Sequence, residues 1–224
     1  MKKDAITQYD AYAKSILSNK IILGHILVGA LEEFKGMTPK EAGTYIIGEP
    51  KVERVSGESG KTNTKEQIHD GEVIRGLNTE DSVVNEGTVR FDILFYARIP
   101  GKAEIIIVNI EAQKEKPKKY SISQRAVFYA SRIISSEKGR DFYGSDYAKI
   151  KRVYTIWVCM NMQENCMVTL KPAFNIIKSP NEWGSTADIS NAVFIGISND
   201  VAGAGEGNDM HRLLGTLFSD KLNG

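Results

Sequence analysis

The sequence predicts an α/β fold in which a central mixed β-sheet is flanked by helices. Three apolar runs of strand length, at 88–99, 104–113 and 153–160, are rich in β-branched and aromatic residues. The segment 121–136, between the second and third runs, is rich in Ala and in long side chains, which is typical of a helix. The order strand, hairpin, helix and strand is typical of helices packed on a mixed sheet.

The remaining elements follow from periodicity and capping signals. A first helix is expected at 18–34, because apolar residues recur there at steps of three and four after Ser18, a suitable N-cap. Thr38 and Glu41 have the spacing of a capping box and predict a short second helix. Residues 49–72 contain hardly any large apolar side chain and predict a surface loop. Later apolar runs predict three strands and a terminal helix, at 168–170, 174–177, 192–197 and 211–218.

The composition is that of a globular protein. The chain has 224 residues, of which 42% are hydrophobic and 25% charged, so it has enough apolar material for a core and too little bias for disorder. We therefore interpret residues 1–224 as a single domain. The net charge is only +1, but the segment 114–152 contains eleven basic and four acidic residues. Positive charge is therefore concentrated in one part of the chain.

The cysteine, histidine and apolar patterns exclude several classes of protein. Cys159 and Cys166 are too few for a disulfide framework, and the three scattered histidines complete no four-ligand zinc site with them. The longest apolar stretch, 21–31, is too short to cross a bilayer and lies too far along the chain for a signal peptide. We therefore expect a reduced, cytoplasmic protein without a membrane partner.

Two carboxylates are expected to meet across the hairpin. With a turn at 100–102, opposed residues have numbers that add up to 202 or 203, and Asp92 and Glu111 meet this condition. If they are directly opposed, their Cβ atoms lie about 4.5–5.5 Å apart. Strand alternation places Gln113, Asn109 and Ile107 on the face of Glu111, and turns Ile106, Val108 and Ile110 into a core on the other face.

Such an acid pair is a candidate metal site. Opposed like charges destabilise a sheet by roughly 0.2–1 kcal/mol, and by more when they are partly buried. A hard divalent cation such as Mg²⁺ would offset this cost, because it takes oxygen ligands from one or two carboxylates. The alternative is that one carboxylate faces solvent or pairs with a Lys or Arg such as Arg90.

The helix after the hairpin has a polar face that suits phosphate. Arg125, Tyr129 and Arg132 fall within a sector of about 60° around the helix axis. Arg and Tyr beside a pair of acids would form a phosphate clamp with a stacking surface. The alternative is an ordinary solvated helix face. The apolar residues gather on the other side of the helix, at Ile122, Ala126, Ala130, Ile133 and Ile134.

Together these residues resemble the PD-(D/E)XK nuclease superfamily, and within it the transposase-associated branch that includes the recombination-promoting nucleases. The resemblance covers residues 18–161 and leaves 162–224 less defined. It is carried by Asp92, by Glu111-Ala112-Gln113, by the helix residues Tyr120, Arg125, Tyr129 and Arg132, and by the strings at 85–88, 109–114 and 125–135.

The resemblance implies a restriction-endonuclease-like core and Mg²⁺-dependent hydrolysis of DNA phosphodiesters, with Mn²⁺ as a substitute ion. It implies that Asp92 and Glu111 hold the metal and that the Ala112 carbonyl is a further ligand. Gln113 would take the place of a Lys that many relatives use to position the attacking water. Glu33, on the first predicted helix, matches an accessory acid.

Three positions depart from the family pattern or bear on it. Phe91 stands where the motif has a Pro, which has no chemical role. Gln113 cannot carry the charge of a Lys, so activation of the attacking water would fall mainly on the metal. Lys114 is one residue further along the strand and should point to the opposite face, so we do not interpret it as a replacement.

The sequence therefore predicts a Mg²⁺-dependent DNA endonuclease associated with transposition or recombination. Its expected partner is DNA, and a homodimer would suit double-strand cutting. The alternative is a nuclease-fold protein, catalytically weak or inactive, that binds nucleic acid or acts as a regulatory or interaction module. The residues expected to hold the DNA backbone, with weak sequence selectivity, are Lys118, Lys119, Arg125, Tyr129 and Arg132.

Overall fold

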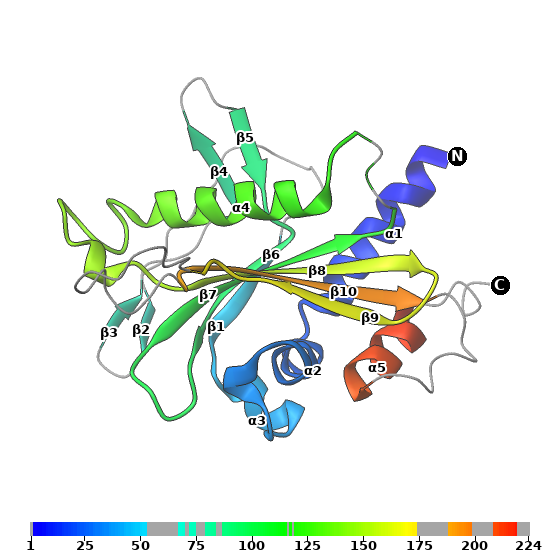
Figure 1. The fold of residues 1–224 in the computed structure, drawn as a ribbon, viewed down its shortest axis with the longest axis horizontal. Helices are drawn as coiled ribbons and strands as arrows, with labels where there is room; N and C mark the ends of the chain where they lie inside the picture. Colours follow the sequence, from blue (N-terminus) through cyan, green and yellow to red (C-terminus); the bar gives the residue numbers. More distant parts are fainter. Residues whose placement is uncertain are drawn as a thin grey trace, which may run out of the picture.

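A six-stranded mixed sheet forms the centre of the molecule (Figure 1). The computed structural model describes residues 2–52, 67–69, 72–74, 79–83, 87–115, 117, 119–173, 188–198 and 208–218. The strands, in their order across the sheet, are β1 (Ile46–Val52), β6 (Ile93–Arg98), β7 (Ile105–Gln113), β8 (Val153–Met162), β10 (Ser190–Ser198) and β9 (Cys166–Leu170). The sheet is mixed because β8 runs parallel to both β7 and β10, whereas the other neighbours are antiparallel.

Helices cover both faces of this sheet (Figure 1). The α-helices among the described residues are α1 (Lys2–Leu17), α2 (Lys20–Ala30), α3 (Pro39–Thr44), α4 (Ile122–Glu137) and α5 (Asp209–Phe218). Helix α4 packs on one face, in a buried cluster that includes Trp157. The other four helices contribute to a second buried cluster on the opposite face, which includes Ile110. The predicted α/β class, a mixed sheet flanked by helices, is confirmed.

The hairpin of β6 and β7 has the register expected from the sequence. Ile93 pairs with Ile110, so paired numbers add up to 203. The turn closes at the predicted place, where the Ile99 N–H donates to the Glu104 carbonyl at 2.9 Å. Side chains alternate as expected, but both faces are buried. Ile106, Val108 and Ile110 lie in the cluster shared by α1, α2, α3 and α5, and Ile107 lies in the cluster beneath α4.

The first predicted helix is shorter than expected. Helix α2 begins after Asn19, whose side chain accepts the N–H of Ile21 at 2.9 Å, so Asn19 and not Ser18 is the N-cap. The helix ends at Ala30, because Leu31 adopts an extended conformation (φ −115°, ψ 127°). A single 3₁₀ turn, Glu32–Phe34, follows. The predicted capping box of Thr38 and Glu41 does begin α3.

The apolar run predicted as one strand at 88–99 forms two strands in different sheets. Strand β5 (Gly87–Arg90) pairs with β4 (Glu80–Val83) in a separate two-stranded sheet. The chain then bends at Asp92 before β6 begins. The Phe91 N–H bonds to the Thr79 carbonyl at 2.8 Å, which holds the bend next to β4. Asp92 therefore lies at the junction of the two sheets.

Parts of the segment 49–72, predicted as a surface loop, form strands. Strand β1 continues through Val52, and β2 (Gln67–His69) pairs with β3 (Glu72–Ile74). Residues 53–66, 70–71 and the run at 174–177 lie outside the described part of the chain.

Helix α1 was not predicted. None of the helices that the structure describes is long and apolar enough to cross a membrane.

A buried ionic cluster lies at the C-terminal end of α4. The Glu137 carboxylate is fully buried and accepts the backbone N–H of Lys151 at 3.0 Å. Asp141 accepts hydrogen bonds from the Tyr96 hydroxyl, the Arg140 guanidinium and the Lys151 ammonium, at 3.1, 2.7 and 2.8 Å. Burial raises the pKa of Glu137 from 4.5 to about 7, helped by the charge of Asp141 and opposed by Lys151 and Arg140.

Glu137→Gln is therefore expected to remove a pH dependence of the stability. Because the pKa of Glu137 is higher in the folded state, its contribution to the free energy of unfolding is fully present below about pH 4.5 and is lost as the pH rises through about 7. The loss approaches about 3 kcal/mol at high pH. Urea unfolding at about pH 5 and about pH 8 should show the variant gaining stability relative to the wild type at the higher pH. The exposed Glu164→Gln is the control, and equal pH dependence in both variants would contradict the assignment.

Candidate functional site

The two predicted acids lie against each other at the end of the hairpin. The backbone N–H of Asp92 donates to Oε1 of Glu111 at 3.1 Å. The backbone N–H of Ala112 donates in turn to Oδ2 of Asp92 at 3.0 Å. The side chain of Asp92 is 13% exposed and that of Glu111 is 2% exposed, so the pair lies at the edge of the buried core. The bend before β6 frees the Asp92 N–H from strand pairing and points it at the Glu111 carboxylate.

A lysine that the sequence did not single out completes one side of the pair. The Lys14 ammonium, on α1, lies 2.9 Å from Oδ1 of Asp92, and Lys14 is only 5% exposed. Arg90, the partner named from the sequence, contacts Glu80 at 3.3 Å. The alternative that one acid pairs with a basic side chain is therefore realised, but by Lys14. The sequence signal for the burial of Lys14 is its position within the apolar stripe formed by Ala13, Ile16 and Leu17.

Several polar groups contact the Glu111 carboxylate. Besides the Asp92 N–H, its Oε1 accepts the side-chain amide of Asn109 at 3.2 Å, and its Oε2 lies 3.5 Å from the Arg125 guanidinium. Burial, followed by the negative charge of Asp92, raises the pKa of Glu111 well above its ordinary value, although these hydrogen bonds and Arg125 oppose the shift. The buried Oδ1 of Asn109 has no hydrogen-bond partner among the described residues.

Arg125 and Tyr129 reach the acid pair from α4. Arg125 donates to the Tyr129 hydroxyl at 2.8 Å and to Oε1 of Gln113 at 3.2 Å. Its guanidinium also stacks on aromatic rings, with the central carbon 4.8 Å from the ring centre of Tyr129 and 5.1 Å from that of Trp157. Gln113 donates its own amide N–H to the Glu115 carbonyl at 2.6 Å. Gln113 therefore contacts the site through Arg125. The Gln113 side chain accepts a hydrogen bond from the Arg125 guanidinium and orients it.

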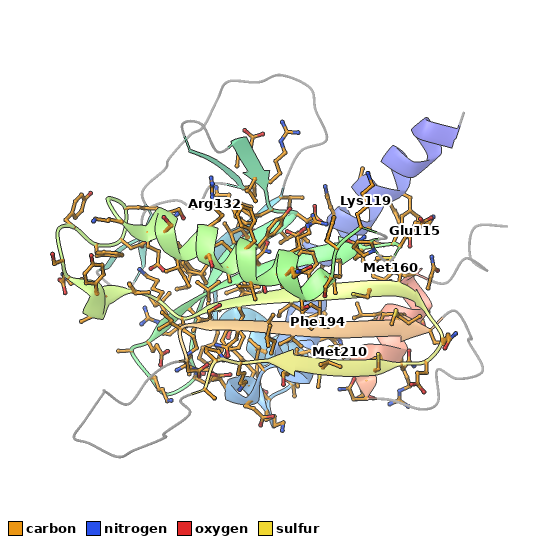
Figure 2. All side chains as sticks on the ribbon, turned by 45° about the horizontal axis from the view of Figure 1, so that its top comes forward. Glu115, Lys119, Arg132, Met160, Phe194 and Met210 are labelled. Carbon is orange, nitrogen blue, oxygen red and sulfur yellow. The ribbon has the colours of Figure 1, made fainter. Side chains whose placement is uncertain are left out.

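The expected DNA-binding residues are only partly in place. Arg132, which the sequence assigns to the DNA backbone, is 5% exposed and lies on α4, which contacts β4 (Figures 1 and 2). The β4–β5 hairpin was not predicted, and the packing of β4 against α4 is a physical reason for this burial. Lys119 is exposed on the segment that joins β7 to α4, as Figure 2 shows. Lys118 lies outside the described residues.

Glu33 lies away from the acid pair. Its Oε1 accepts hydrogen bonds from the Arg152 guanidinium and from the Tyr154 hydroxyl, the latter at 2.7 Å. Arg152 directly precedes β8, whereas Glu111 pairs with Trp157, further along that strand and on its other face. The structure therefore does not bring Glu33 together with Asp92 and Glu111.

Two carboxylates are the protein ligands that this site offers to a cation. In the part of the chain that the structure describes, no group of three or more Asp, Glu, His or Cys side chains could hold a metal. Mg²⁺ is often bound by one or two carboxylates with water and phosphate completing its shell, so Asp92 and Glu111 fit it. Burial and the charge of Asp92 raise the pKa of Glu111, and a bound cation would offset both effects. Ala112 contacts Asp92 through its N–H.

Comparison of the chain with protein-family models, with curated proteins and with solved structures gives no match.

Proposed function

We propose that this protein is a Mg²⁺-dependent DNA endonuclease, with Mn²⁺ as a substitute ion. The observation that supports the proposal is the contact between Asp92 and Glu111, two acids held together in a largely buried place where their charges repel. Proteins rarely bury carboxylates unless they are paired or bind a metal, and a divalent cation is a common ligand of two adjacent carboxylates. The resemblance to transposase-associated PD-(D/E)XK nucleases gives the substrate class.

The neighbouring side chains have defined roles in this proposal. Asp92 and Glu111 would hold the ion, which would supply polarisation of the scissile phosphate and a lowered pKa of a bound water molecule. Arg125, oriented by Gln113 and Tyr129, supplies positive charge and hydrogen-bond donors beside the acids. Lys119 is exposed on the loop between β7 and α4 and contacts the DNA backbone.

The test is cleavage of supercoiled plasmid with Mg²⁺, with Mn²⁺ and with a chelator. We expect nicking that requires the metal and that weakens strongly as the salt concentration rises, because the contacts are to phosphate. The variant Asp92→Asn should lose this activity. The matched control is Asp146→Asn, which changes an exposed carboxylate paired with Lys149 on the segment between α4 and β8. Equal nicking by wild type and Asp92→Asn would contradict the proposal.

The products also report on a homodimer. One acid pair per chain would cut one strand, so nicked circles should accumulate before linear plasmid if single chains act alone. Linear product that forms without accumulation of nicked circles would indicate two chains acting together. Protein concentration series distinguish the two cases, because a dimer loses double-strand cutting on dilution.

A second candidate function is nucleic-acid binding without turnover. It is favoured by the contacts of Lys14 and Arg125, which already place a positive charge beside each acid, and by Gln113 at the position of a Lys. In that case the protein would retard DNA in a gel at low salt and leave it intact with both metals. Asp92→Asn would then leave the binding affinity unchanged.

A further inference from the structure

Lys14 is a buried cation aimed at the proposed metal site. Fully buried lysines are rare unless they are paired, because removing an ammonium from water carries a large desolvation cost. Lys14 lies among apolar neighbours, Ala13 and Leu17, and its ammonium is 2.9 Å from Oδ1 of Asp92. The packing of α1 therefore determines the charge balance at an acid that lies 78 residues further along the chain.

The position of α1 over this end of the sheet is defined by more than one contact. The Tyr9 hydroxyl donates to the sulfur of Met160 on β8 at 3.0 Å. The Lys114 ammonium lies 4.0 Å from the centre of the Tyr9 ring. Lys114 follows β7, the strand that carries Glu111. These contacts dock helix α1 on the ends of β7 and β8. The docking holds Lys14 in place beside Asp92.

Each acid has one carboxylate oxygen that accepts a backbone hydrogen bond and one that faces a side-chain cation. Oδ2 of Asp92 and Oε1 of Glu111 accept hydrogen bonds from backbone N–H groups of the hairpin itself. Oδ1 of Asp92 and Oε2 of Glu111 face the side-chain cations, Lys14 at 2.9 Å and Arg125 at 3.5 Å. A metal ion that uses Oδ1 of Asp92 must therefore separate it from the Lys14 ammonium. The shorter contact makes Lys14 the stronger competitor of the two.

We propose that Lys14 competes with the divalent cation for Asp92, so that the docking of α1 lowers the metal affinity of the site. This inference rests on the proposed function, because it takes Asp92 and Glu111 as the metal ligands. In the metal-free protein the ammonium offsets the charge of Asp92, and Arg125 lies beside Glu111. Metal binding requires the ammonium to leave Oδ1, and the remaining positive charge repels the ion. Both effects disappear when the charge of Lys14 is removed.

The test is calorimetric titration of the protein with Mn²⁺ in the absence of DNA. Lys14→Met keeps an unbranched side chain that is one atom shorter and removes its charge, and we expect it to bind Mn²⁺ at least tenfold more tightly than the wild type. The melting temperature of this variant should be lower without metal, and Mn²⁺ should raise it by more than it raises that of the wild type. The control Lys20→Met removes a lysine paired with Glu49 on the surface and should leave the affinity unchanged.

Further variants keep the result interpretable if Lys14→Met does not fold. Lys14→Gln should also tighten binding, whereas Lys14→Arg, which retains the charge, should not. Adding Asp92→Asn to Lys14→Gln should abolish the gain. Binding of Mn²⁺ by Lys14→Met and Lys14→Gln that is no tighter than that of the wild type, including no binding by any of them, would overturn the inference. A protein that shows the predicted gain but never cuts DNA would contradict the nuclease proposal and leave this one standing.

Discussion

Glu111→Gln is expected to abolish metal-dependent DNA cleavage while leaving the protein at least as stable as the wild type. Loss of one of two metal carboxylates removes several kcal/mol of transition-state stabilisation, so the rate should fall by about 10³-fold or more. The amide retains an oxygen that can accept the Asp92 N–H and the Asn109 amide. Because burial and the charge of Asp92 raise the pKa of Glu111 in the folded state, this carboxyl group lowers the free energy of unfolding as the pH rises, and the neutral amide avoids that cost.

The measurement pairs a plasmid cleavage time course with urea unfolding of the same preparations. The control is Glu115→Gln, an exposed carboxylate beyond the end of β7, which should leave both quantities unchanged. Combining Glu111→Gln with Asp92→Asn should slow cleavage little further, because residues that hold one ion act as a unit. A Glu111→Gln protein that is fully active, or additive losses from the two changes, would remove Glu111 from the proposed mechanism.

Trp157→Ala is expected to cause the largest loss of stability. Trp157 is fully buried on β8 beneath α4, with the Tyr129 ring centre 5.5 Å away and the Arg125 guanidinium stacked over it. Truncation of a buried Trp to Ala typically costs about 3–5 kcal/mol. This is a large fraction of the stability of an ordinary domain. Urea or thermal unfolding measures it.

Trp157→Phe distinguishes packing from hydrogen bonding at this position. The Trp157 Nε1–H is buried and has no hydrogen-bond partner among the described residues. Phe removes this unsatisfied donor and keeps most of the apolar contact with Tyr129, so we expect a cost well below that of Ala. If Phe and Ala destabilise the protein equally, the indole N–H has an interaction that the present contacts do not account for.

The hairpin and the helix after it were predictable because their signals are local. A turn at 100–102 and strict alternation in 104–113 define which residues of two neighbouring strands can meet, so the encounter of Asp92 with Glu111 follows from counting. The cap at Ser121 and the apolar periodicity of 122–137 likewise define α4 and turn Arg125 and Tyr129 to one side.

The residues that were misplaced depend on contacts between segments far apart in the chain. Glu33 was expected near the acids, but Arg152 and Tyr154 bind it at the start of β8. Arg132 was expected to contact the DNA backbone and is buried on a helix that β4 contacts. Arg152 is far from Glu33 in the sequence, and β4 is far from Arg132. Periodicity within one segment carries no information about contacts between such distant segments.

Local patterns thus establish the mixed sheet, the hairpin register and the two acids at its end. The charge environment of those acids is a property of the assembled fold, since Lys14 comes from a helix at one end of the chain and Arg125 from a helix that crosses over the sheet. Strand pairing and helix periodicity arise from backbone geometry, which repeats every few residues. A buried ion pair such as Lys14 with Asp92 depends instead on how whole elements pack, because only packing excludes the water that would otherwise separate the charges.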